Sequence, residues 1–166
     1  MFEIEIDSNT PLDVFYDTLN SQLASLLDGE RDLICNAAQF SAFVMQTLPE
    51  LNWAGFYFAR DKQLVLGPYV GKVACTRIPF GRGVCGAVAH SQKTQRVEDV
   101  HAFVGHIACD SASASEIVIP IVYEGDLIGV FDIDSPKVGR FSPADQDGLE
   151  ALVTTFIEST DLEWSF

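Results

Sequence analysis

The chain has 166 residues, of which 48% are hydrophobic, and its 10 basic residues face 24 acidic ones, for a formal net charge of -14. This length and apolar content suit one compact core, so residues 1–166 are expected to form a single domain. A negative charge of this size repels phosphate backbones and anionic lipid surfaces, so neither nucleic acid nor a membrane is an expected partner.

The N-terminal sequence, MFEIEIDSNT, lacks the basic start and the apolar run of a secretory signal. No stretch approaches the ~20 apolar residues that a membrane span requires, so we expect a cytoplasmic protein. A disulfide-stapled secreted scaffold carries a higher fraction of cysteine, so we expect reduced thiols. The cysteines are Cys35, Cys75, Cys85 and Cys109.

Two helices are predicted before any strand. Thr10 and Pro11 signal a helix start, and apolar residues then recur at helical spacing as far as Leu26. A second helix is predicted over residues 32–48, with Pro49 closing it. Cys35 falls inside this segment, where a buried packing role is expected.

From residue 51 the pattern changes to that of β-strands. In a strand, Trp53, Gly55 and Tyr57 would lie on one face of the sheet. Residues 54, 56 and 58 would lie on the other face. Strand character continues through QLVLGPYV and KVACTRI. Further on, EIVIPIVY and DLIGVFDID flank Glu124-Gly125 as a hairpin.

Loops and one more helix complete the predicted order. Glycine-rich GRGVCG enters a short helix, residues 98–115 form a long irregular loop, and Ser142-Pro143 opens a C-terminal helix. We therefore expect an α+β fold, with a central antiparallel sheet on which two N-terminal helices and the C-terminal helix pack.

The GRGVCG motif, residues 81–86, has the glycine spacing of a dinucleotide-binding turn. That site also needs a βαβ unit and an acid ~20 residues later, whereas Glu98 and Asp99 come too early. What remains is a helix start that favours an anion, either a ligand carboxylate or the thiolate of Cys85.

Metal ligation is not expected, because structural zinc sites pair ligands two to four residues apart and these cysteines are more widely spaced. His101 and His106 are interpreted as loop-packing or surface residues.

Asp132 and Asp134 lie two apart on a predicted strand and so share one face. They fit either a solvated strand end or a pocket for a cation such as a substrate ammonium. Trp53 and Tyr57 likewise fit either the core or the aromatic wall of a ligand pocket.

Motifs from about residue 51 to about residue 151 resemble those of the free methionine-(R)-sulfoxide reductases: LNWAGFYF, LVLGPY, GKVAC, RIPFGRGVCG, QRVEDVHAF, GHIACD, SEIVIPIV, LIGVFDIDS and GRF. The resemblance implies a GAF-type fold and an oxidoreductase that reduces the R epimer of free methionine sulfoxide under oxidative stress. It also implies little activity on the same residue inside a protein.

The resemblance also implies roles for the cysteines. Cys109 of GHIACD would attack the sulfoxide, Cys75 of GKVAC would resolve the sulfenic acid as an intramolecular disulfide, and Cys85 would be an accessory or alternative partner. Local electrostatics favours Cys85 as nucleophile instead, because its helix start should lower its pKa whereas Asp110 should raise that of Cys109. No bound cofactor is implied; thioredoxin, reduced indirectly by NADPH, is the expected electron donor. A homodimer is expected only at the level of the family.

For the substrate, the resemblance implies that Trp53 and Tyr57 wall the methyl group. Glu116, Asp132 and Asp134 would hold the ammonium and the sulfoxide oxygen, and one acid must be protonated to donate to that oxygen. Backbone N–H groups of residues 110–115 are candidates for the substrate carboxylate. The alternative is a GAF sensor that binds a small ligand, or registers oxidation, without turnover.

Overall fold

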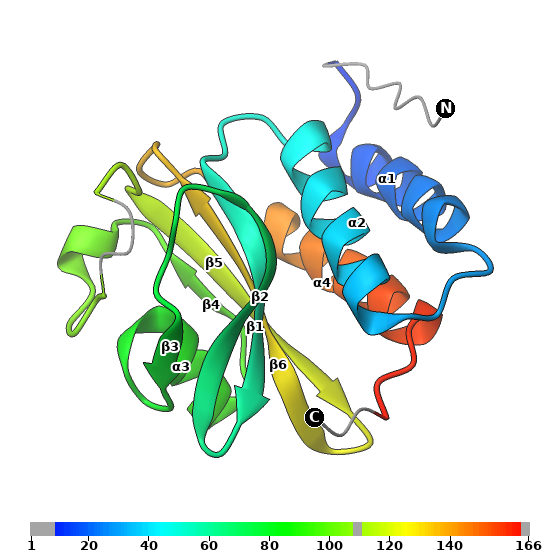
Figure 1. The fold of residues 1–166 in the computed structure, drawn as a ribbon. Coiled ribbons are helices and arrows are strands. Elements are labelled where there is room, and N and C mark those ends of the chain that lie inside the picture. The colour runs from blue at the N-terminus through cyan, green and yellow to red at the C-terminus, as the bar shows by residue number, and fades with distance from the viewer. Residues whose placement is uncertain (1–8, 108–110, 164–166) are drawn as a thin grey trace.

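A six-stranded antiparallel sheet divides the molecule into two layers, and the computed structural model describes residues 9–107 and 111–163 of it. Helices α1 (Leu12–Leu27), α2 (Leu33–Thr47) and α4 (Pro143–Ser159) cover one face. Helix α3 (Gly83–Ser91) and the long loop lie on the other face (Figure 1). The predicted α+β architecture is confirmed.

The strands run in the order β3-β2-β1-β6-β5-β4, and every neighbouring pair is antiparallel. Their bounds are β1 Trp53–Arg60, β2 Gln63–Gly71, β3 Arg77–Pro79, β4 Gln95–Val97, β5 Ser115–Tyr123 and β6 Asp126–Ser135, and a 3-10 turn spans Val100–Ala102. The longest strands are therefore central, and the two three-residue strands form the edges.

Local signals explain where several elements begin. The Asp32 carboxylate accepts from the backbone N–H of Cys35 and caps α2. Ser142 and Asp145 form a reciprocal capping box at the start of α4. In the β5–β6 turn both Glu124 and Gly125 have positive φ, of 50° and 89°, as the tight hairpin turn requires.

Three local expectations were wrong. Helix α1 starts one residue late, with Pro11 rather than Thr10 at the N-cap. Cys35 is exposed rather than packed, because α2 turns its neighbours Asn36 and Ala37 to the interior. Residues 72–76 are not strand, so β3 keeps only the last part of the predicted KVACTRI segment.

The sheet separates two apolar clusters. Phe40, Phe56, Phe131 and Phe156 stack between the sheet and the three-helix layer, with ring centroids 4.6–5.8 Å apart. The second cluster lies against α3 and contains Trp53, Tyr57, Val84, Cys85 and Val130. The alternation predicted for β1 and β6 is confirmed, because even positions of β1 enter the first cluster and Trp53 and Tyr57 the second.

Candidate active site

A pocket lies on the α3 face of the sheet and encloses about 390 Å³ of empty space, part of it open to solvent. Its thiol and acidic lining residues are Cys85, Glu116, Asp132 and Asp134. Its other polar, aromatic and apolar lining includes Tyr57, Ile78, Arg82, His106, Ile107 and Ser113.

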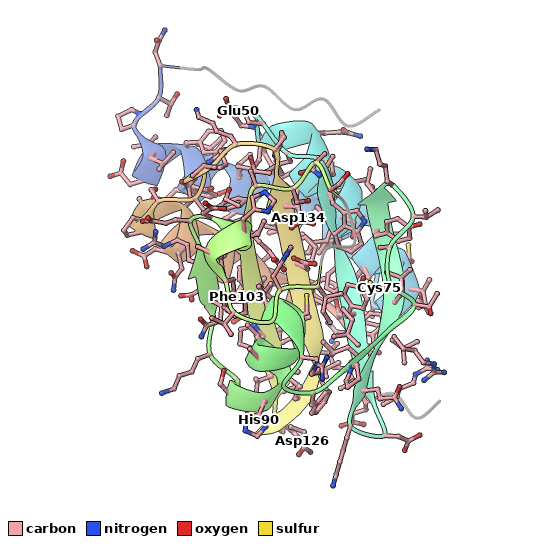
Figure 2. All side chains as sticks on the ribbon, turned by 90° about the vertical axis from the view of Figure 1, so that its left-hand side faces the viewer. Glu50, Cys75, His90, Phe103, Asp126 and Asp134 are labelled. Carbon is pink, nitrogen blue, oxygen red and sulfur yellow. The ribbon has the colours of Figure 1, made fainter. Side chains whose placement is uncertain are left out.

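Strand register brings the acids together. Asp134 on β6 pairs with Glu116 on β5 and with Trp53 on β1, so these three residues form one row across the sheet. Asp132 lies in the next row with the same orientation, opposite Gly55. Figure 2 looks onto this face and shows Asp134 on the sheet between the segment of Phe103 and the loop of Cys75.

Helix α3 adds a thiol to the acids. The Cys85 Sγ atom donates to Glu116 Oε1 at 3.9 Å, and Cys85, Glu116 and Asp132 are each no more than 6% exposed. Asp132 hydrogen-bonds to both Cys85 and Glu116, yet its Oδ1 atom is buried with no hydrogen-bond partner. The pocket therefore has unsatisfied acceptor capacity at its floor.

Burial raises the pKa values of these acids. The pKa of Glu116 lies well above its usual value because of desolvation and the neighbouring charges of Asp132 and Asp134. Burial raises the pKa of Asp132 to about 6, against the lowering effect of hydrogen bonds from Cys85, Glu116 and the Ile133 N–H. The prediction that clustering raises at least one carboxyl pKa is confirmed.

The electrostatic expectation for Cys85 was wrong. Its thiol pKa is raised well above the ordinary value by complete burial and by the charges of Asp132 and Glu116. The increase in pKa from desolvation and from two carboxylates outweighs the decrease expected at the start of α3. Cys85 is therefore a protonated, buried thiol.

The two predicted aromatic residues differ in position. Tyr57 lines the pocket, its ring is almost fully buried, and its hydroxyl donates to the Cys75 carbonyl oxygen at 3.1 Å. Trp53 is not among the described lining residues; it stacks between Tyr57 and Tyr69, with centroids 5.9 and 5.2 Å away. Trp53 thus packs beside Tyr57 in the second apolar cluster.

The cysteines separate into three kinds. Cys35 and Cys85 are free thiols, whereas Cys75 is disulfide-bonded, contrary to the expectation of reduced thiols throughout. Cys109, the predicted nucleophile, lies outside the described residues, as does Asp110.

Sequence reasoning missed three polar lining residues: Arg82, His106 and Ser113. The expectation of a loop or surface role for His106 was incomplete, because its Nε2 lies 3.7 Å from Glu116 Oε2. Burial and the charge of His101 lower the pKa of His106, which favours the neutral imidazole. Ser113 accepts from the Asn52 amide at 3.1 Å, and no motif signalled either contact.

Comparison with known proteins identifies the family. The GAF domain family model matches residues 36–156. Free methionine-R-sulfoxide reductase of Escherichia coli is 52% identical over 139 residues, which cover 84% of each chain. This chain belongs to the free methionine-R-sulfoxide reductase family of GAF domains.

Two further likenesses extend over nearly the whole chain. Protein YtsP of Bacillus subtilis is 50% identical over 163 residues, or 97% of each chain. The structure of free methionine-R-sulfoxide reductase from Neisseria meningitidis in complex with its substrate matches with a TM-score of 0.90 and 36% identity, over 96% of this chain and 95% of that one. Among the described residues, no helix is long and apolar enough to span a membrane.

Proposed function

We propose that this protein reduces free L-methionine (R)-sulfoxide to methionine. The observation that carries the proposal is the 52% identity to the Escherichia coli enzyme of that name. The pocket supports it independently, because it combines three acids with the aromatic ring of Tyr57, whose hydroxyl contacts the disulfide-bonded Cys75. A free amino acid sulfoxide presents an ammonium, an apolar methyl and a polar oxygen, which need these different surroundings.

In the first step, the Cys109 thiolate attacks the sulfoxide sulfur. A carboxylic acid of the pocket protonates the sulfoxide oxygen, which passes to Cys109 as a sulfenic acid while methionine leaves. The raised pKa values of Glu116 and Asp132 support either as the proton donor. The raised pKa of the Cys85 thiol argues against Cys85 as the attacking group.

In the second step, the Cys75 thiol attacks the sulfenic sulfur, releasing water and leaving a Cys75–Cys109 disulfide. The disulfide-bonded state of Cys75, beside free Cys35 and Cys85, supports Cys75 as the resolving residue. A dithiol donor then reduces the disulfide; we expect thioredoxin, with NADPH as the ultimate source of electrons.

For substrate binding, Asp134 and the ionised member of the Glu116–Asp132 pair would hold the ammonium. Tyr57, with the Trp53 ring stacked on it, would wall the methyl group. The Ala114 N–H already donates to the Ser135 carbonyl at 2.8 Å, which removes one of the expected donors to the substrate carboxylate. Arg82, on the pocket rim, offers a cation in its place.

The proposal is tested by following NADPH consumption with thioredoxin and thioredoxin reductase. The substrates are free R sulfoxide, free S sulfoxide and a peptide-embedded sulfoxide. We expect turnover of the free R form alone, loss of that turnover in Cys109→Ser, and full activity in the matched control Cys35→Ser, whose thiol is exposed and free. No turnover of any sulfoxide, even with dithiothreitol, would favour the sensor alternative. An active Cys109→Ser variant would move the nucleophile elsewhere.

A further inference from the structure

Three side chains with metal-binding atoms, one thiol and two carboxylates, converge in the pocket. Cys85 Sγ, a Glu116 oxygen and an Asp132 oxygen all lie within 4.8 Å of one another, and all three side chains are buried. In a tetrahedral zinc site, bonds of about 2.3 Å to sulfur and about 2.0–2.2 Å to oxygen hold neighbouring ligand atoms roughly 3.5 Å apart. Metal binding would therefore draw these three ligand atoms closer together.

A second observation points to a bound cation at this place. Asp132 lines the pocket and is only 6% exposed, and its Oδ1 atom has no hydrogen-bond partner. An orphaned carboxylate oxygen in the interior is unfavourable unless a ligand meets it. A coordinated metal ion would satisfy that oxygen directly.

The long loop places an imidazole beside one of these ligands, Glu116. His106 Nε2 lies 3.7 Å from Glu116 Oε2, on the opposite carboxylate oxygen from the one that accepts from Cys85. Glu116 is therefore flanked by a sulfur donor on one side and an imidazole on the other.

We propose that Cys85, Glu116 and Asp132 bind a divalent ion of the zinc class, with the fourth position left to a water molecule. A thiolate ligand favours Zn²⁺ or Co²⁺ over Mg²⁺ and Ca²⁺, which prefer oxygen donors throughout. On binding, the Cys85 thiol gives its proton to solvent and forms a metal–sulfur bond, with no change of oxidation state.

The site overlaps the acids that we assign to the substrate. Zinc and methionine sulfoxide therefore exclude each other, and zinc acts as a reversible inhibitor. This consequence, unlike the binding itself, rests on the proposed function.

The binding is tested with Co²⁺ on the oxidised protein, in which Cys75 is in a disulfide and cannot ligate. Among the described residues only Cys35 and Cys85 then offer a thiol. We expect one equivalent of Co²⁺ to bind with a near-ultraviolet sulfur-to-cobalt charge-transfer band. The band should persist in Cys35→Ser, disappear in Cys85→Ser, and be displaced by Zn²⁺.

Asp132→Asn gives a second variant, for which we expect at least about 10-fold weaker Co²⁺ binding with the charge-transfer band retained. Circular dichroism of each variant verifies folding. Absence of the band in wild type, or its persistence in folded Cys85→Ser, would overturn the proposal. In the activity assay Zn²⁺ should raise KM for the sulfoxide without lowering kcat. If no sulfoxide is turned over, the cobalt spectra still decide whether the metal site exists.

Discussion

The Cys85 thiol donates to Oε1 of Glu116 across 3.9 Å inside a pocket that buries both side chains. The donor must keep its proton for this contact to exist. A thiol in this environment is a poor nucleophile, since thiolates carry out alkylation and sulfoxide attack alike.

Alkylation should therefore distinguish Cys35 from Cys85, the two free thiols among the described residues. We expect iodoacetamide at pH 7.5 to label Cys35, which is exposed, and to leave Cys85 unlabelled until the chain is unfolded. Peptide mass spectrometry reads out both positions, and Cys85 should stay unlabelled in native Cys35→Ser as well. Rapid native labelling of Cys85 would contradict its burial.

Stability should fall as pH rises through the range in which Asp132 ionises. Its pKa is about 6 in the folded protein against 3.8 ordinarily, so between these values the native state binds more protons than the unfolded chain. The stabilising effect is complete below about pH 4 and is lost as pH rises through about 6, by on the order of 2–3 kcal/mol. Glu116, whose pKa is also raised, adds to the loss in the same direction.

Urea denaturation of wild type and Asp132→Asn from pH 4 to pH 8 measures this effect. The variant cannot ionise at this position, so its free energy of unfolding should decline less with pH. Asp147→Asn, which removes an exposed carboxylate from α4, should keep the wild-type slope. Equal slopes in all three proteins would show that burial of Asp132 does not govern the decline.

Glu116→Gln tests proton donation by the pocket. The amide keeps the shape and donates hydrogen bonds but transfers no proton, so kcat for free methionine (R)-sulfoxide should fall about 10²-fold or more if Glu116 is the acid. KM should change less than kcat. The matched control is Glu98→Gln, an exposed acid, which should leave both constants unchanged. An unchanged kcat in Glu116→Gln, with a large loss in Asp132→Asn, would transfer the role to Asp132.

Gly148→Ala should weaken the packing of α1 against α4. A Cβ atom at residue 148 would lie 2.1–2.4 Å from the ring of Tyr16, so the helices must separate or the ring must move. We expect a loss of about 1–3 kcal/mol in the free energy of unfolding, measured by urea denaturation. In a Tyr16→Ala background the same change should be nearly harmless, and a full loss there would exclude the clash as the cause.

The sequence predicted the central strands well because their environments alternate. Phe56 and Phe131 lie on one face and Asp132 and Tyr57 on the other, and a two-residue period is visible without any tertiary information. The helix starts at Asp32 and Ser142 could equally be predicted from the sequence, since capping depends on residues close in sequence.

Features that depend on contacts between residues distant in sequence could not be predicted. Strand β4 has only three residues, which is too short for a two-residue period to be recognised. It is a strand because it pairs with β5, a contact that is distant in sequence. His106 reaches Glu116 because a loop folds over the sheet. Burial, together with the carboxylates of strands β5 and β6, raises the pKa of Cys85, whereas its own sequence neighbourhood predicts the opposite shift.

The two faces of the sheet separate the residues that stabilise the fold from the residues that line the pocket. On β1 and β6, one set of alternate positions holds the phenylalanine cluster and the other set holds the pocket, with a single backbone between them. Replacements at residues 57, 132 or 134 can therefore retune what the pocket accepts while positions 54, 56, 131 and 133 keep the helices attached. Related domains can therefore change their ligands through substitutions at alternate residues of β1 and β6 alone.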